Sequence, residues 1–404
     1  MKLAWRNLFR NKRRSFIAGT AIGIGLASLI FVDALVIGMK NNMIRSATAS
    51  FMGDGQIHAE GFRQTQEVDN TIHRGEWVEA QLDKENIIQH WAPRVTNLAM
   101  INSAADLSSI NLVGVKPEQE KYLSQVDESM VKGDFFKGEN SRDILIGKEL
   151  AETLDVELGD RVVVTAAQAG TGDLSQEMFW ISGIFQMNIK EMDSAVVFIR
   201  IKKAQELFGL GNKIHEIALR FPDPSYGQNQ QLYLWDKYSQ FGNVAEGWTE
   251  IMPQMKAALS LFDFSTYLVA LILFGVVALG IVNTLFMSLH ERMFEFGVLR
   301  AIGTRPAGLF RLIVFEAGSL AVLSIVIGII LGFILTYVTS KVGINYTGIE
   351  FAGVTFRDLL YPVLKVNQFI EYPIWVFVFT IIAGIYPAVY AAKMNPAKAM
   401  RRSL

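Results

Sequence analysis

The chain has 404 residues, of which 51% are hydrophobic, and a formal net charge of -1 at pH 7. A charge this close to zero argues against a general binder of nucleic acid or other polyanions. The absence of cysteine excludes a disulfide framework, a thiolate metal site and a cysteine nucleophile. The length leaves room for two or three domains, or for one domain together with a membrane part.

The chain begins with the basic, acid-free stretch "MKLAWRNLFRNKRRS", which predicts an amphipathic cytoplasmic segment at residues 1–15. A long apolar stretch follows at residues 16–39. It reaches the roughly 20 residues that a helix needs to cross about 30 Å of hydrocarbon. The alternative is a cleavable signal peptide, but the apolar region of such a peptide usually has only about 7–15 residues. We therefore predict a first transmembrane helix at residues 16–39.

Residues 40–265 indicate a folded α+β domain inserted between the first two spans. The segment Ile144–Ala167 contains a short strand, a helix, a turn at Gly159–Asp160 and a strand rich in β-branched residues. The stretch "KKAQELFGLG" predicts a short helix closed by glycine, and "AQAGTGDLSQ" predicts a loop. Further strands are expected at Met178–Gln186, Ser194–Ile201 and His215–Phe221.

A stalk helix is expected at residues 248–265, directly ahead of the second span. Its apolar residues alternate at spacings of four and three, as in a coiled-coil seam: Trp248, Met252, Met255, Leu259 and Phe262. Pro253 lies inside this pattern, so the regular helix is expected to begin there. The alternative is a helix that packs on its own domain.

Three more apolar stretches predict transmembrane helices at residues 267–289, 312–338 and 373–392. The fold class is therefore an α-helical membrane protein with four transmembrane helices and a large α+β extracytoplasmic domain between spans 1 and 2.

Lysine and arginine placement sets the orientation. The basic start, the link at residues 290–311 and the tail at residues 393–404 are rich in basic residues and are predicted to be cytoplasmic. The inserted domain and the shorter loop at residues 339–372 then lie outside, and both termini lie inside.

The link after the second span, "HERMFEFGVLRAIGTRP", predicts an amphipathic helix at residues 290–303. Its charged and apolar residues separate at spacings of three and four: Glu291, Arg292 and Glu295 on one side, and Phe294, Val298 and Ile302 on another, with Met293 and Phe296 beside them. Gly303 is a suitable helix stop, and Thr304 with Pro306 can start the next helix. Such a helix lies at the cytoplasmic interface, with its charged side toward a partner; the alternative is an interfacial anchor without one.

Signatures of catalysis are absent from the sequence. There is no G-x-x-x-x-G-K-[ST] phosphate loop, no H-E-x-x-H and no G-x-S-x-G, and the five histidines have no ligand spacing. We predict no catalytic, cofactor-binding or metal site in this chain, and no enzymatic activity of its own. Asp33 and Glu316 lie within spans, where a carboxylate serves either ion coupling or a structural or interfacial role.

Several motifs resemble those of the FtsX/MacB/LolC-LolE permeases, the type VII or mechanotransmission ABC transporters. The segment "NTLFMSLHERMFEFGVLRAIGTRPAGLFRLIVFEA" is similar to their signature through Asn283, Glu291, Arg292, Glu295, Gly297, Leu299, Arg300, Ala301, Gly303 and Glu316. The end "YPAVYAAKMNPAKAMR" is similar through Pro387, Ala388, Ala391, Ala392, Pro396 and Ala399. The stretches "LVGVKPEQE", "ILIGKELAETLDVELGD" and "ISGIF" resemble the MacB-type periplasmic core domain, and "AWRNLFRNKRRS" resembles the family's start.

The resemblance implies a non-catalytic permease subunit in the bacterial inner membrane. ATP and Mg²⁺ would be bound by a separate cytoplasmic ABC ATPase, which seats the link as a coupling helix through Glu291, Arg292, Glu295, Phe296, Gly297, Leu299, Arg300 and Gly303. Such permeases work as dimers with a second permease subunit, identical or different. Motion then passes through the stalk to the periplasmic domains, and no pore through the spans is required.

The cargo is the least defined feature. The absence of a fused ATPase and the stretch "GDGQIHAEGF" resemble the LolC/LolE-like branch, which implies release of lipoproteins. The alternatives are a MacB-type efflux permease for drugs or peptides with a periplasmic adaptor, an FtsX-like scaffold that regulates a cell-wall hydrolase, and an ion-coupled carrier that uses Asp33 and Glu316.

Overall fold

The structure is a computed structural model that describes residues 12–138, 140–346, 350–351, 354–355 and 359–395. Most of the predicted basic segment and most of the predicted tail, with Pro396 and Ala399, lie outside these residues. The chain divides into two compact units, which are described separately. The helical unit comprises Met1–Asn41, Leu259–Tyr346 and Asp358–Leu404, and the sheet domain comprises Asn42–Ala258 and Thr347–Arg357.

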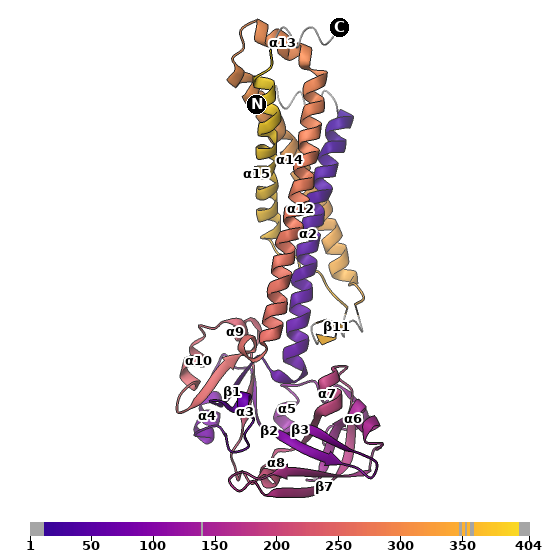
Figure 1. Ribbon diagram of the computed structural model, residues 1–404, viewed down its shortest axis with the longest axis vertical. Coiled ribbons are helices and arrows are strands. Elements are labelled where there is room, and N and C mark those ends of the chain that lie inside the picture. Colours follow the sequence, from indigo (N-terminus) through magenta and orange to yellow (C-terminus); the bar gives the residue numbers. More distant parts are fainter. Residues whose placement is uncertain (1–11, 139, 347–349, 352–353, 356–358, 396–404) are drawn as a thin grey trace. The chain divides into compact units, whose positions relative to one another are not determined.

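Four long helices form the helical unit and lie side by side (Figure 1). They are α2 (Lys12–Ala47), α12 (Pro253–Glu291), α14 (Pro306–Val342) and α15 (Gln368–Ala392). All four are long and apolar enough to cross a membrane. Each extends beyond the corresponding predicted span, because helical hydrogen bonding continues into polar residues that a hydrophobicity pattern leaves out. In particular, α15 begins at Gln368, ahead of the expected Pro373, which lies inside the helix.

Small residues let α2 and α14 approach closely. A Cβ added to Gly328 would lie 2.8 Å from Cβ of Leu26, and one added to Gly23 would lie 3.0 Å from the Ser324 carbonyl oxygen. Close backbone approach through glycine is typical of helix packing in membranes. Buried residues of all four helices complete this core: Ile22, Leu26, Leu29, Ile30, Phe274, Ile281, Leu285, Leu320 and Val376.

The sheet domain has one ten-stranded sheet and nine short helices among its described residues, labelled in part in Figure 1. The strands are β1 (Gly55–Ala59), β2 (His90–Asn102), β3 (Leu107–Val115), β4 (Met130–Gly133), β5 (Asp143–Gly147), β6 (Arg161–Ala167), β7 (Leu174–Phe185), β8 (Val196–Arg200), β9 (Glu216–Arg220) and β10 (Asn243–Gly247). The helices are α3 (Phe62–Thr65), α4 (Gly75–Leu82), α5 (Pro117–Glu120), α6 (Lys148–Thr153), α7 (Lys190–Ala195), α8 (Ile201–Phe208), α9 (Ser225–Gln228), α10 (Tyr233–Tyr238) and α11 (Trp248–Ile251). A π-helical turn, η1 (Thr48–Met52), follows α2, and a separate pair of short strands is formed by β11 (Glu350–Phe351) and β12 (Val354–Thr355).

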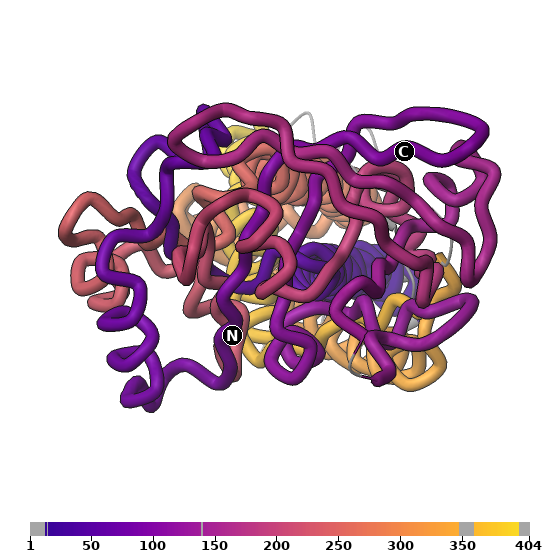
Figure 2. Tube along the Cα trace, turned by 90° about the horizontal axis from the view of Figure 1, so that it is seen from below, coloured from indigo at the N-terminus to yellow at the C-terminus, as the bar shows by residue number. Residues whose placement is uncertain are grey.

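The strands β2, β3, β8, β5, β7 and β6 pair in a closed cycle, because β6 pairs with both β7 and β2. The strands β9, β1 and β10 extend the sheet from the first half of β2, and β4 pairs with β7. Figure 2 shows the backbone trace of these strands from below. The long strand β2 therefore belongs both to the closed cycle and to the extension formed by β9, β1 and β10, and its Arg94 lies in the half that pairs with β9.

The predicted strands and the short helix of this domain are found in the structure. The helix α8 ends at Gly209, which has φ +69° as expected for a glycine stop. The predicted loop "AQAGTGDLSQ" is partly wrong, because β7 begins at Leu174 and pairs with β6 as a hairpin. Ser194 and Ala195 lie in α7 rather than in the strand that follows. Polar residues in a solvent-exposed part of a strand give the same sequence pattern as residues in a loop.

Candidate coupling site

The link between α12 and α14 contains the helix α13 (Met293–Ala301). The helix α12 continues to Glu291, and the backbone changes direction at Arg292, with φ -108° and ψ 14°. The N–H of Arg292 is shared by the carbonyl oxygens of Ser288 and Leu289, at 3.2 and 3.3 Å. The predicted helix at residues 290–303 is therefore too long at its start, because His290 and Glu291 complete the hydrogen bonding of α12.

Phe296 anchors α13 to the helical unit. Its side chain is 1% exposed and packs in a small core with residues of α12, α14 and α15: Leu289, Leu309, Ile313, Ala388 and Ala391. Gly297 beside it is also buried. Burial of a phenylalanine side chain stabilises by about 1.5–3 kcal/mol, so α13 is firmly packed against three transmembrane helices.

Arg292 ties α13 to α14 through an ion pair. Its Nη1 donates to Glu316 at 3.1 Å, its Nε donates to Glu295 at 3.1 Å, and its guanidinium carbon lies 4.8 Å from the ring centre of Phe296. The side chains of Arg292 and Glu316 are 13% and 11% exposed. Arg292 thus points toward α14 and not outward as expected, and Glu316 acquires a structural partner. Loss of one partner of a largely buried ion pair is strongly destabilising, because the other charge remains in apolar surroundings.

The end of α13 is fixed by a Schellman motif. The N–H of Thr304 donates to the carbonyl of Leu299 at 2.9 Å, and that of Gly303 donates to the carbonyl of Arg300 at 3.2 Å. Gly303 has φ +106°, so the predicted helix stop is confirmed. Arg300 adds a hydrogen bond from Nη1 to the Thr304 carbonyl at 3.2 Å. Pro306 lies in the first turn of α14, whose N-cap is Arg305 and not Thr304.

The open side of α13 carries both acidic and apolar residues. Phe294, Leu299 and Ile302 are 50%, 39% and 80% exposed, and Glu291 and Glu295 are exposed beside them. The expected separation into a charged side and an apolar side is therefore wrong, because Glu291 belongs to α12 and Arg292 turns inward to Glu316. We call these five residues the α13 surface. Clustered exposed apolar residues of this kind mark interaction sites.

The expected stalk is interrupted. Trp248 lies in α11, is 1% exposed and donates from Nε1 to the carbonyl of Pro224 at 3.2 Å. Met252 is not helical, with φ -124° and ψ 71°, and α12 begins at Pro253 as predicted. Met255, Leu259 and Phe262 lie on α12, but Trp248 and Met252 do not continue their seam.

The sequence did not predict a buried charge cluster where α2 enters the sheet domain. Arg94 and Glu120 are fully buried, with Arg94 Nη2 2.6 Å and Nε 3.0 Å from the two Glu120 oxygens. Arg94 also donates to Glu216 at 2.9 Å and to the carbonyl of Phe51, in η1, at 2.7 Å. Burial alone would lower the pKa of Arg94, but Glu120 and Glu216 outweigh burial and raise it. The guanidinium therefore stays charged.

Arg220 completes this cluster on the neighbouring strand β9. Its Nη2 donates to the carbonyl of Thr48 at 3.3 Å and to that of Leu123. Its Nη1 lies 3.5 Å from Asp54, which accepts a hydrogen bond from the N–H of Phe221 at 2.9 Å. Burial raises the pKa of Asp54, and Arg220 partly opposes this. We call Arg94, Arg220, Glu120, Glu216 and Asp54 the arginine joint. The sequence signal was the presence of charged residues in mainly apolar strands, Arg94 in β2 and Glu216 with Arg220 in β9.

These features define a class of protein. Four candidate membrane helices, an α+β domain between the first two, and a short helix after the second describe a multi-span membrane protein with a large domain outside the bilayer.

Comparison with protein families narrows this class. The model of the MacB-like periplasmic core domain matches residues 15–228, slightly more than half of the chain. The model of the FtsX-like permease C-terminal domain matches residues 267–396, which include α13. The chain belongs to the FtsX/MacB-like permease family, and the resemblance seen in the sequence is confirmed.

Named relatives agree with the family. The chain is 23% identical to the lipoprotein-releasing system transmembrane protein LolE of Haemophilus influenzae over 98% of each chain. It is 23% identical to LolC of Neisseria meningitidis serogroup B over 77% of each chain. Among solved structures, it is similar to the periplasmic region of MacB from Actinobacillus actinomycetemcomitans, with 12% identity, a TM-score of 0.35, and coverage of 51% of this chain and 94% of that one.

Proposed function

We propose that this chain is the membrane subunit of an ABC transporter that releases lipoproteins from the bacterial inner membrane. The observation that carries this proposal is the likeness to a lipoprotein-releasing transmembrane protein over 98% of both chains. ATP and Mg²⁺ would be bound by a separate cytoplasmic ATPase, because the sequence has no phosphate loop. Both termini would lie in the cytoplasm and the sheet domain in the periplasm.

The α13 surface is the part we assign to the ATPase. Its apolar residues, up to 80% exposed at Ile302, would fill a groove of the partner, and Glu291 and Glu295 would pair with basic groups at its rim. Because Phe296 and Arg292 fix α13 to its neighbours, a displacement of α13 would move α12, α14 and α15 together.

Transmission to the sheet domain would use α2 and α12, which both continue along the chain into that domain. A second permease subunit, identical or different, would supply the other half of the transporter. In this account the chain has no catalytic residue of its own, and its work is mechanical.

Purification of the intact complex tests this proposal. The chain is extracted in mild detergent through an affinity tag, and its partners are identified by mass spectrometry. We expect a soluble ABC ATPase, a permease subunit and acylated protein. A periplasmic adaptor with an outer-membrane channel would instead support the MacB-type efflux function, which the MacB-like domain favours as second candidate. A bound cell-wall hydrolase would support the FtsX-like scaffold.

Release of lipoprotein from proteoliposomes provides the functional measurement. Glu291→Lys or Arg300→Glu should abolish ATP-dependent release and stimulation of the ATPase. Ile302→Glu is the cleaner variant, because its side chain is 80% exposed and its replacement leaves the core unchanged. Glu152→Lys, at an exposed position of the sheet domain, is the matched control and should behave like the wild type. Normal stimulation in all three coupling-site variants would contradict the assignment.

A further inference from the structure

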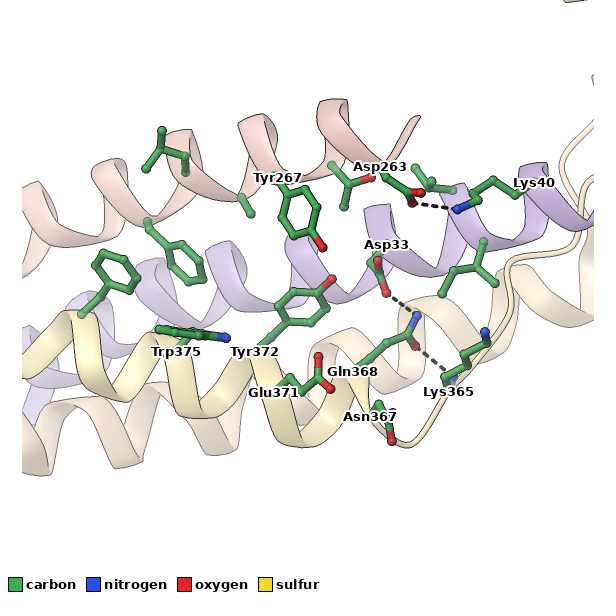
Figure 3. A pocket seen from close by; sticks show the side chains of 17 residues that line it. Asp33, Lys40, Asp263, Tyr267, Lys365, Asn367, Gln368, Glu371, Tyr372 and Trp375 are labelled. Atoms are coloured by element: carbon green, nitrogen blue, oxygen red, sulfur yellow. Dashed lines mark hydrogen bonds and ion pairs between the residues drawn. The ribbon is translucent and has the colours of Figure 1, made fainter. Parts of the chain in front are cut away.

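The helical unit contains a cavity of about 550 Å³ between α2, α12 and α15 (Figure 3). Its volume lies in the range of small-molecule sites in proteins, about 300–1,000 Å³. The cavity is formed by one chain alone and shares no residue with the α13 surface. Figure 3 shows polar groups gathered at one end of it and aromatic rings at the other.

The polar end of the cavity contains charged side chains that form no ion pair with any residue that the structure describes. Asp33 accepts a hydrogen bond from Gln368 Nε2 at 2.8 Å, but no cation pairs with it among the described residues. Glu371 and Lys365 likewise pair with no charged group in the part of the chain that the structure describes. Only the rim pair of Lys40 and Asp263, 2.7 Å apart, is satisfied. Asp33 lies inside a predicted span, where a carboxylate is costly and marks a functional site unless it is paired.

Two tyrosines and a tryptophan lie beside these carboxylates, in addition to the phenylalanine rings at the other end of the cavity. The hydroxyl groups of Tyr267 and Tyr372 point toward Asp33, and Trp375 lies one turn further along α15 (Figure 3). Carboxylates beside aromatic faces are the usual recognition elements for an ammonium group. Asp33 accepts a hydrogen bond from Gln368 and also interacts with the Tyr372 hydroxyl. A carboxylate has about four acceptor positions, so a primary ammonium can still donate to it directly. A quaternary ammonium has no N–H and cannot.

The other end of the cavity is apolar. Phe274 and Phe379 stack with their ring centres 4.7 Å apart, and Leu271 lies on the wall. From Asp263 at the polar rim to Phe274 at the floor, α12 rises by roughly 16 Å at about 1.5 Å per residue. This is close to half of the roughly 30 Å hydrocarbon thickness, or one leaflet. Tyr267, Leu271 and Trp375 are 76%, 67% and 52% exposed, so this side of the cavity is open.

We propose that this cavity binds one phospholipid with a primary amine in its headgroup, of the phosphatidylethanolamine type. The ammonium lies between Asp33 and Glu371, the phosphate contacts the Lys365 ammonium, and the first part of an acyl chain covers Leu271 and the stacked phenylalanines. The two carboxylates complement the ammonium of such a headgroup, and Lys365 complements its phosphate. An anionic headgroup without an amine would leave both carboxylates unpaired. The site is separate from the cargo assigned above and does not depend on it.

Native mass spectrometry of the full chain tests this site. The chain is reconstituted in nanodiscs that contain equal parts of phosphatidylethanolamine, phosphatidylcholine and phosphatidylglycerol, and the lipids that remain bound after release are identified. We expect retention of one phosphatidylethanolamine in clear excess over the other two. Asp33→Asn combined with Glu371→Gln should reduce this preference about tenfold, the value of one charged hydrogen bond.

Two controls keep the test decisive. Asp236→Asn, at an exposed position of the sheet domain, should leave the lipid preference unchanged. Leu271→Trp, which fills the open cavity without changing any charge, should lower lipid retention while the helix content stays constant. Equal retention of all three lipids, retention that the double variant does not alter, or occupation by an acylated protein in place of a phospholipid would each overturn the proposal. None of these measurements requires the ATPase, so their failure leaves the proposed transport function standing.

Discussion

The two places where the long helices enter the sheet domain differ in how they are held. In η1, directly after α2, the carbonyls of Thr48 and Phe51 are bound by Arg220 and Arg94, and Arg94 is fully buried. At the start of α12, the carbonyl of Ile251 is bound by Arg63 at 2.5 Å, but Arg63 is 31% exposed and the backbone is broken at Met252. Buried charged groups with several hydrogen bonds hold the surrounding backbone in one conformation. A helix that is interrupted ahead of a proline can bend at the interruption.

This difference suggests a division of roles. The arginine joint bonds the η1 turn, which directly follows α2, to strands β2 and β9. In the proposed transporter, this connection would pass motion of α2 into the sheet. The break at Met252 separates α12 from α11, whose Trp248 is packed in the sheet domain. In the proposed transporter, the first connection would transmit motion and the second would bend.

The largest expected effect comes from removing the centre of the arginine joint. Arg94→Met should lower the free energy of unfolding of the sheet domain by about 3–5 kcal/mol, because Glu120 and Glu216 stay buried without a partner. Thermal unfolding of the purified full chain in detergent measures this. The triple variant Arg94→Met, Glu120→Leu, Glu216→Leu should recover much of the stability but not lipoprotein release. Recovery of both would show that the joint does not transmit motion.

The second connection should be less sensitive. Arg63→Ala removes the hydrogen bonds to the Ile251 and Glu250 carbonyls and the ion pair with Glu246, 2.8 Å away. Because these groups are partly exposed, we expect a loss of only about 1 kcal/mol in the same thermal measurement. A loss as large as that of Arg94→Met would remove the contrast between the two connections.

Acid should weaken the sheet close to the arginine joint. His215 accepts the N–H of Thr96 at Nδ1, 3.2 Å away, and lies 2.8 Å from the Val68 carbonyl through Nε2. Burial lowers the pKa of His215 below its usual 6.5. Between these two pKa values, the folded state therefore binds fewer protons than the unfolded state. The contribution of His215 to the free energy of unfolding is complete above pH 6.5 and is lost as the pH falls toward the folded pKa. The loss is at most about 1.4 kcal/mol per pH unit. Unfolding midpoints from pH 7.5 to pH 5 measure this. His73→Gln, at an exposed position, should keep the slope, and His215→Gln should flatten it.

The smallest effect on stability is expected at the break itself. Pro253→Ala restores a backbone N–H, so α11 and α12 can join into one helix with a change in stability below about 1 kcal/mol. Amide hydrogen exchange across residues 249–257 should become slower, and the coupling of ATP hydrolysis to release should fall. Unchanged exchange and unchanged coupling would mean that the break has no mechanical role.

Much of this architecture could be read from the sequence, because it rests on local signals. Four apolar stretches marked the helices, Pro253 marked the start of α12, and Gly303 and Gly209 marked helix ends. The buried face of α13 could not be read, because Phe296 enters a core formed with residues of α14 and α15 that are distant in the sequence. The arginine joint could not be read either, because Arg94 meets Glu216 through the pairing of distant strands and meets Glu120 through the packing of α5.

Site-specific photo-crosslinking at Ile302 in intact cells tests the central claim most directly, because it asks what covers the α13 surface. The account predicts a crosslink to a soluble ABC ATPase that is lost in the Glu291→Lys variant, and no such crosslink from Tyr233 of the sheet domain. Crosslinks from Ile302 only to lipid or to periplasmic proteins would contradict it.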